Sequence, residues 1–152
     1  MLIEEKFTIK APIQNAWDFI TNPERLASCF PGCEQVQAID EKTFRCVVKQ
    51  KIAGISATFK LSISLTATNP PYHIESIVKG EDMGKSGAVT QKNILDLKKI
   101  GSDETEICYR SDLAVVGRIA IFGERIIKAK AKQIAQQFVC SLKGKLQSVE
   151  TP

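Results

Sequence analysis

Residues 122–146 read FGERIIKAKAKQIAQQFVCSLKGKL, a stretch without proline whose pattern predicts one long amphipathic helix. Its apolar side chains recur at spacings of three and four, which places them on one face of a helix with about 3.6 residues per turn. They are Phe122, Ile126, Ile127, Ala131, Ile134, Ala135, Phe138, Leu142 and Leu146. At about 1.5 Å rise per residue this helix runs roughly 35–40 Å. A helix of this length needs a broad apolar surface, and we expect a sheet formed by the preceding residues to supply it.

Length and composition favour one soluble domain that spans residues 1–152. Of the 152 residues, 43% are hydrophobic and 25% are charged, which are ordinary values for a globular protein. The formal net charge of +4 is too small to indicate a nucleic-acid-binding protein. No run approaches the ~18 apolar residues of a transmembrane helix, and the N-terminal MLIEEKFTIK lacks the features of a signal peptide. We therefore expect a cytoplasmic protein.

The cysteines and the single histidine indicate neither a metal centre nor a catalytic triad. The five cysteines are scattered without a CxxC pair, so we expect reduced thiols and no structural metal site. They are Cys29, Cys33, Cys46, Cys108 and Cys140. His73 follows the turn residues Asn69-Pro70-Pro71, where we expect a solvent-facing strand position. A nucleophilic triad built on one histidine has little support, and we expect no cofactor.

The N-terminal quarter of the chain reads as one strand followed by two short helices. Residues 2–9 alternate between apolar and polar side chains, as a half-buried strand does. Pro12 opens a helix whose apolar face includes Ala16 and Trp17. Asn22 and Pro23 form a capping signal for a second helix, PERLASCF, which Pro31-Gly32 ends.

From residue 33 to residue 116 the period of the pattern changes to two. Alternating segments separated by short turns predict six further strands, joined as an antiparallel meander with one solvated face. The dry face of such a sheet can be buried only against the long helix. The sequence therefore predicts an α+β helix-grip fold. In it, a seven-stranded antiparallel sheet curves around the C-terminal helix, and the two short helices follow the first strand.

Some polar residues fall on the inward-facing positions of the predicted strands, beside the apolar ones, and they suggest a function. They are Gln50, Ser76, Gln91, Asn93 and Ser111. A buried polar group without a partner costs about 1–3 kcal/mol, so these groups contact each other, trapped water or a ligand. An apolar hollow with a few inward polar groups is typical of a small-molecule pocket. On this parity Tyr109 is the only candidate acid or base, and the pattern places no acid beside it.

The predicted ligand-binding residues line the hollow between sheet and helix. They are Phe30, Phe59, Leu61, Val78, Met83, Val89, Gln91, Asn93, Tyr109, Ser111, Leu113, Phe122 and Ile126. Phe30 and Met83 are expected near its mouth. Lysines and arginines of the last helix form a basic face that is either simply solvated or docks on an anionic membrane or an acidic partner. They are Arg125, Lys128, Lys130, Lys132, Lys143 and Lys145.

Three blocks carry a resemblance to a known family. The first combines Ala11-Pro12 and Ala16-Trp17 with NPERLASCFPGCE at residues 22–34, and the second is GEDMGKSG at residues 80–87. The third is YRSDLAVVGRIAIFGERII at residues 109–127. Over nearly its whole length the chain resembles the G subunit of molybdenum-type carbon monoxide dehydrogenase, within the START-like, polyketide-cyclase-like (SRPBCC) superfamily.

The resemblance implies a binding protein rather than an enzyme. Relatives are thought to bind hydrophobic ligands and to bring a molybdenum hydroxylase to the membrane or to handle its quinone acceptor. The implied partners are therefore a quinone- or lipid-like molecule, a molybdenum hydroxylase such as carbon monoxide dehydrogenase, and the inner face of the cell membrane. Some relatives carry a membrane-seeking extension; this sequence departs from that pattern by ending at Pro152, so the resemblance does not extend to independent anchoring. A cyclase- or hydratase-type enzyme, which the superfamily also includes, is the alternative.

Overall fold

The computed structural model describes residues 1–85 and 87–149. Within these residues the chain forms seven strands, three α-helices and one 3-10 helix. In chain order they are β1 (Leu2–Ile9), α1 (Ile13–Ile20), α2 (Pro23–Ala27), β2 (Cys33–Ala38), β3 (Thr43–Ile52), β4 (Ile55–Asn69), β5 (His73–Asp82), β6 (Ala88–Gly101), β7 (Glu104–Val116), η1 (Arg118–Phe122) and α3 (Glu124–Val149).

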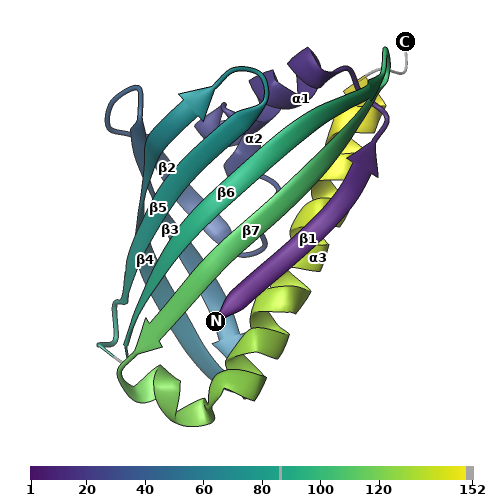
Figure 1. Ribbon diagram of the computed structural model, residues 1–152. Helices are drawn as coiled ribbons and strands as arrows, with labels where there is room; N and C mark the ends of the chain where they lie inside the picture. The colour runs from purple at the N-terminus through teal and green to yellow at the C-terminus, as the bar shows by residue number, and fades with distance from the viewer. Residues whose placement is uncertain (86, 150–152) are drawn as a thin grey trace.

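The strands form one antiparallel sheet in the order β1-β7-β6-β5-β4-β3-β2. Strands β2 to β7 are joined as consecutive hairpins, and β1 pairs with β7 from Leu2 opposite Asp112 to Ile9 opposite Thr105. The sheet curves around α3, and α1 and α2 lie at one end of the trough (Figure 1). The predicted α+β helix-grip arrangement of seven antiparallel strands, two short helices and a long C-terminal helix is confirmed.

Local signals place the two short helices. The Asn22 side chain accepts a hydrogen bond of 3.1 Å from the Arg25 backbone N–H, and Pro23 occupies the first helical position. Both features satisfy the requirements of a helix N-terminus, as the sequence predicts. Pro12 stands one position ahead of α1 rather than inside its first turn. Helix α2 ends at Ala27, three residues before the predicted end of this segment.

The long helix begins two residues later than predicted. Phe122 is the last residue of η1, and Gly123, at a φ of 86°, separates η1 from α3. A positive φ is a conformation that glycine adopts without a Cβ penalty, so the break falls at this position. Helix α3 then continues past Leu146 to Val149. Among the residues that the structure describes, no helix combines the length and apolar character needed to cross a membrane.

The hydrophobic core is divided into two clusters at opposite ends of α3. One packs α1 and the end of β1 against the C-terminal part of α3, and it includes Trp17, Ile107 and Leu142. The other packs η1 and the start of α3 against β4 and β7, and it includes Phe59 and Ile127.

Between these clusters α3 does not fill the trough of the sheet. Ile127 and Leu142 are fifteen positions apart in the helix, which corresponds to about 22 Å. The small side chains of Ala131 and Ala135 lie in this interval and face the hollow. A straight helix across a curved sheet therefore leaves a cavity in the middle of the fold.

Candidate functional site

The central cavity has a volume of about 340 Å³, which is within the range of small-molecule pockets. Its wall is formed by inward-facing residues of all seven strands, by α2, and by one face of α3. Most of the lining side chains are apolar, among them Ile3, Phe7, Leu26, Phe30, Phe44, Val48, Phe59, Leu61, Ile63, Leu65, Val78, Val89, Leu95, Leu113, Val115, Ile134 and Phe138. The ring centroids of Phe30, which follows α2, and of Phe138 in α3 lie 6.4 Å apart.

A line of polar side chains crosses the apolar wall on strands β5, β6 and β7. The Tyr109 hydroxyl donates a hydrogen bond of 3.1 Å to the Asn93 side-chain carbonyl oxygen. The Asn93 amide in turn donates to the Ser76 hydroxyl at 3.4 Å. Gln91, one inward position away from Asn93 on β6, also lines the cavity. Two of the predicted inward polar residues, Ser76 and Asn93, therefore hydrogen-bond each other. Gln91 faces the cavity next to them.

Burial raises the pKa of the Tyr109 hydroxyl above its ordinary value. The phenol consequently stays protonated at neutral pH and acts as a hydrogen-bond donor. Ser111 is only 1% exposed, and its Oγ has no hydrogen-bond partner among the residues that the structure describes. Ser111 is adjacent to Asn93 in the register of β6 and β7, but it does not line the cavity.

A carboxylate does lie beside Tyr109, contrary to the expectation from the strand pattern. Glu5 on β1 pairs directly with Tyr109 on β7, and both residues line the cavity. The alternation of residues 2–9 already places Glu5 on the same face as Ile3 and Phe7. The sequence alone does not say that β1 pairs with β7, so the proximity of the two groups was missed.

Nine of the thirteen predicted site residues line the cavity: Phe30, Phe59, Leu61, Val78, Val89, Gln91, Asn93, Tyr109 and Leu113. Ser111, Met83, Phe122 and Ile126 do not. Met83 follows the last residue of β5 and is 56% exposed. Phe122 packs against the core cluster around Ile127. Ile126 is 44% exposed because the next residue, Ile127, occupies the inward position of α3.

The basic residues predicted to form one face of α3 lie in different environments. Lys130 lines the cavity, and the Lys143 ammonium lies 5.9 Å from the centre of the Phe7 ring. The Lys145 ammonium donates to the Ser28 carbonyl at 2.9 Å and to its hydroxyl at 2.7 Å. The six basic residues therefore do not form one uniform docking face.

The cavity reaches the surface beside the connection between β2 and β3. Asp40, Glu41 and Lys42 of this connection are exposed and yet line the cavity. With Glu5 and Lys130, they provide the charged side chains of the cavity wall. This composition suits a molecule with an apolar body and a polar end.

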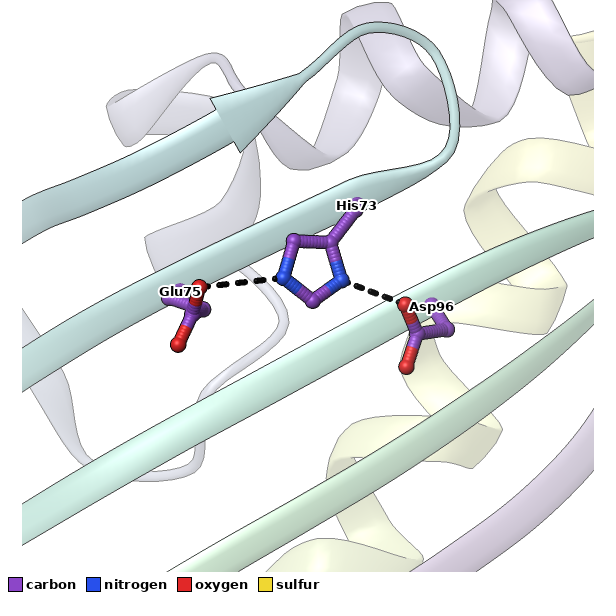
Figure 2. Close-up of polar contacts among 3 residues, drawn as sticks. All are labelled: His73, Glu75 and Asp96. Carbon is purple, nitrogen blue, oxygen red and sulfur yellow. Dashed lines mark hydrogen bonds and ion pairs between the residues drawn. The ribbon is translucent and has the colours of Figure 1, made fainter.

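A second polar cluster lies on the outer face of the sheet. His73 contacts Asp96 through Nδ1 at 2.5 Å and Glu75 through Nε2 at 3.1 Å (Figure 2). The hydrogen bonds to Asp96 and Glu75 raise the pKa of His73 above 6.5. Because Ile74 takes the inward position of β5, this cluster is on the face opposite to the cavity. No group of three or more potential metal ligands with suitable placement occurs within residues 1–85 and 87–149.

Solved structures share this fold at low sequence identity. A conserved protein from Geobacillus kaustophilus is 24% identical with a TM-score of 0.89, and the match covers 97% of this chain and 96% of that one. A START superfamily protein from Mycobacterium smegmatis is 14% identical with a TM-score of 0.77, covering 97% and 98%. The Zhui aromatase/cyclase from Streptomyces sp. R1128 is 13% identical with a TM-score of 0.73, covering 97% and 93%.

At the level of sequence, a single family model accounts for nearly the whole chain. The model of the carbon monoxide dehydrogenase G subunit, CoxG, matches residues 6–147. No curated protein matches the sequence.

Proposed function

Because the chain belongs to the CoxG family, named for the G subunit of carbon monoxide dehydrogenase, we propose that it is an accessory protein that binds a hydrophobic small molecule in the cavity between sheet and helix. The observation that carries this proposal is the division of the core into two clusters with a lined hollow of about 340 Å³ between them. A chain selected only for stability gains by filling such a space, since each cavity in a core costs free energy.

The lining favours a quinone- or lipid-like ligand with an apolar body and an oxygen-bearing end. Tyr109 donates a hydrogen bond, and Gln91 offers both a donor and an acceptor beside it. A ligand carbonyl can accept a hydrogen bond from the Gln91 amide, and a ligand hydroxyl can donate to the Gln91 oxygen or to the Tyr109 hydroxyl oxygen. The apolar wall on either side would take up the rest of the molecule.

Organic extraction and native mass spectrometry of the freshly purified protein test this proposal. We expect a co-purified apolar molecule, and we expect an added fluorescent apolar probe to be displaced by a naphthoquinone or a fatty acid. Ile63→Trp, which places a large side chain in the cavity, should abolish probe binding. The control Ile77→Trp changes the neighbouring strand at an outward position. Equal probe binding by both variants would contradict a ligand site in the cavity.

The partner we propose is a molybdenum hydroxylase such as carbon monoxide dehydrogenase, which the protein serves by recruitment or by electron transfer through the bound ligand. The description of the matching family supports this choice. A pull-down with the purified hydroxylase, with and without ligand in the cavity, tests it. Binding that depends on ligand would favour electron transfer, whereas binding that ignores the ligand would favour recruitment.

We further propose peripheral contact with an anionic membrane, through the end of the fold at η1 rather than through the whole of α3. Three connections lie at this end of the fold, as the strand register and Figure 1 indicate. Exposed apolar side chains lie in or next to these connections. They are Ile55, Met83, Val116, Ile121 and Ile126, of which Ile121 is 82% exposed. Exposed Lys51, Lys85, Arg118 and Arg125 accompany them, against the acidic Glu81 and Glu124.

Co-sedimentation with vesicles tests this contact. Ile121→Ser should weaken binding to vesicles that contain phosphatidylglycerol, and added salt should weaken it further because the basic groups are screened. Ile100→Ser changes an exposed isoleucine at the opposite end and serves as the control. If neither salt nor Ile121→Ser affects sedimentation, the η1 end does not contact the lipid.

The enzyme alternative is supported by the pairing of Glu5 with Tyr109 in the cavity. A carboxylate next to a protonated phenol can accept and donate a proton on the same substrate, as a cyclase or hydratase requires. Glu5→Gln distinguishes the two functions. A carrier keeps probe affinity within a few-fold, whereas an enzyme loses turnover of a polyketide-like substrate by a factor of about 100 or more.

A further inference from the structure

Two thiols meet in the wall of the cavity, on strands β2 and β3. Cys33 pairs with Val48 in the strand register, and Cys46 lies two residues before Val48 on the same face of β3. The two cysteines are therefore diagonal neighbours on the inward face of the sheet. Both residues line the cavity, Cys33 is partly accessible, and Cys46 is buried.

The turn before β2 fixes the position of Cys33. The Cys33 N–H donates to the Phe30 carbonyl at 3.2 Å, and the Lys49 N–H donates to the Gly32 carbonyl at 3.0 Å. Gly32 has a φ of 79°, and a Cβ there would lie 2.1 Å from the Lys49 carbonyl oxygen. Only glycine fits this approach of turn and strand. The turn thus holds Cys33 firmly against β3 and next to Cys46.

We propose that Cys33 is a nucleophilic site that forms a covalent adduct with α,β-unsaturated carbonyl ligands in the cavity, with Cys46 as its proton-donating partner. This rests on the proposed function, because the acceptor must enter the apolar hollow to reach the thiol. Quinonoid molecules are members of this chemical class. No other cysteine in the described residues both lines the cavity and has a thiol neighbour.

The two thiols have different roles: Cys33 is the nucleophile and Cys46 is the proton donor. The hydrogen bond from Cys46 lowers the pKa of the Cys33 thiol, against the opposing effects of burial and of the Glu34 carboxylate. The same bond, together with burial, raises the pKa of Cys46, which stays protonated. Lys49 lies 3.3 Å from Glu34 and offsets the charge of that carboxylate. A thiolate is the reactive form of cysteine, so Cys33 is the nucleophile of the pair.

The reaction requires no oxidant or reductant. The Cys33 thiolate donates an electron pair to the β-carbon of the acceptor, and a C–S bond forms as the C=C π bond breaks. The electrons move to the carbonyl oxygen, and the resulting enolate takes a proton from the Cys46 thiol, which solvent then reprotonates. The product is a thioether that retains every atom of the acceptor.

Limited labelling with N-ethylmaleimide, followed by peptide mapping, tests the site on the intact protein. We expect Cys33 to be labelled before Cys140, which is exposed on α3 and serves as an internal control. Cys46→Ala should slow labelling of Cys33 about three- to tenfold at neutral pH and move its pH–rate curve to higher pH. Cys46→Ser keeps a donor and should restore most of the rate. Labelling of Cys140 ahead of Cys33, or a rate unchanged by Cys46→Ala, would overturn the proposal.

A second arm uses a limiting amount of 1,4-naphthoquinone without oxygen. We expect a mass increase equal to one intact quinone at Cys33, whereas a loss of two hydrogens with a Cys33–Cys46 disulfide would overturn adduct formation. Probe binding to unlabelled protein is measured in parallel. If the probe binds but Cys33 is not preferred, the covalent site fails and the carrier function stands. If Cys33 reacts first but the probe does not bind, the thiol site stands and the carrier function fails.

Discussion

Glu5 lies directly opposite Tyr109 in the register of β1 and β7, and both side chains line the cavity. Tyr109 also donates its hydroxyl hydrogen to Asn93 at 3.1 Å. A carboxylate, a protonated phenol and an amide thus gather at one point of an apolar wall. We propose that the polar end of a ligand is recognised at this point, where the proposed carrier and the alternative enzyme differ.

Replacing Tyr109 by Phe removes one hydrogen bond without changing the shape of the wall. We expect the fold to persist and ligand affinity to fall by about two- to tenfold, because one neutral hydrogen bond is worth about 0.5–1.5 kcal/mol. Titration of the apolar probe or of a naphthoquinone measures the change. Tyr72→Phe, at an exposed tyrosine outside the cavity, is the control and should leave affinity unchanged. A loss of several orders of magnitude in any turnover would favour the enzyme.

Isoleucine truncation should have different effects in the packed core and at the cavity. Ile9 is fully buried in the core cluster around Trp17, so Ile9→Ala should cost about 2–5 kcal/mol of unfolding free energy. Ile63 lines the existing cavity and is only half-buried, so Ile63→Ala should cost less than about 2 kcal/mol. Urea denaturation of both variants gives the comparison. Equal losses would mean that the space beside Ile63 is filled in solution.

Two glycine-to-alanine changes should have opposite signs. At Gly32 the added Cβ meets the Lys49 carbonyl oxygen at 2.1 Å and φ is 79°, so Gly32→Ala should destabilise by more than about 2 kcal/mol. At Gly144, inside α3, a Cβ meets nothing within 4 Å. Gly144→Ala should therefore stabilise the protein by roughly 0.5–1 kcal/mol through helix propensity. Thermal unfolding of each variant tests the pair, and a stable Gly32→Ala protein would show that the turn relaxes.

The His73 cluster should make stability depend on pH. Its hydrogen bonds to Asp96 and Glu75 raise the pKa of His73 above 6.5 in the folded protein. A group with a raised folded-state pKa contributes stability that is complete below its unfolded pKa, here 6.5. This contribution is lost as the pH rises through the higher folded-state value.

We therefore expect the difference in Tm between the wild type and His73→Gln to be largest below pH 6.5 and to shrink above it. Asp96→Asn removes the carboxylate that contacts His73 Nδ1. In this background, the Tm difference caused by His73→Gln should be smaller at low pH. A difference that does not vary with pH would contradict a raised pKa of His73 in the folded protein.

The sequence alone was sufficient for the fold and for part of the cavity wall. Strand alternation depends only on which side chains point to one face, and this is a local property. It correctly placed residues such as Leu61, Gln91 and Tyr109 on the inward face. The spacing of apolar residues in 122–146 likewise required a long helix over the sheet, and α3 follows that stretch closely.

Tertiary structure decided which of these residues come together and how the helix is rotated. Glu5 and Tyr109 meet because β1 pairs with β7, and Cys33 meets Cys46 because a glycine turn holds β2 against β3. Alternation shows which face of the sheet a residue occupies, but it does not show which strand lies next to it. Strand pairing therefore cannot be obtained from periodicity. Successive helix residues differ by about 100° around the axis, so Ile126 turns outward once Ile127 faces the core. The hollow itself follows from a straight helix packed at both ends of a curved sheet, a relation between whole elements that no local pattern contains.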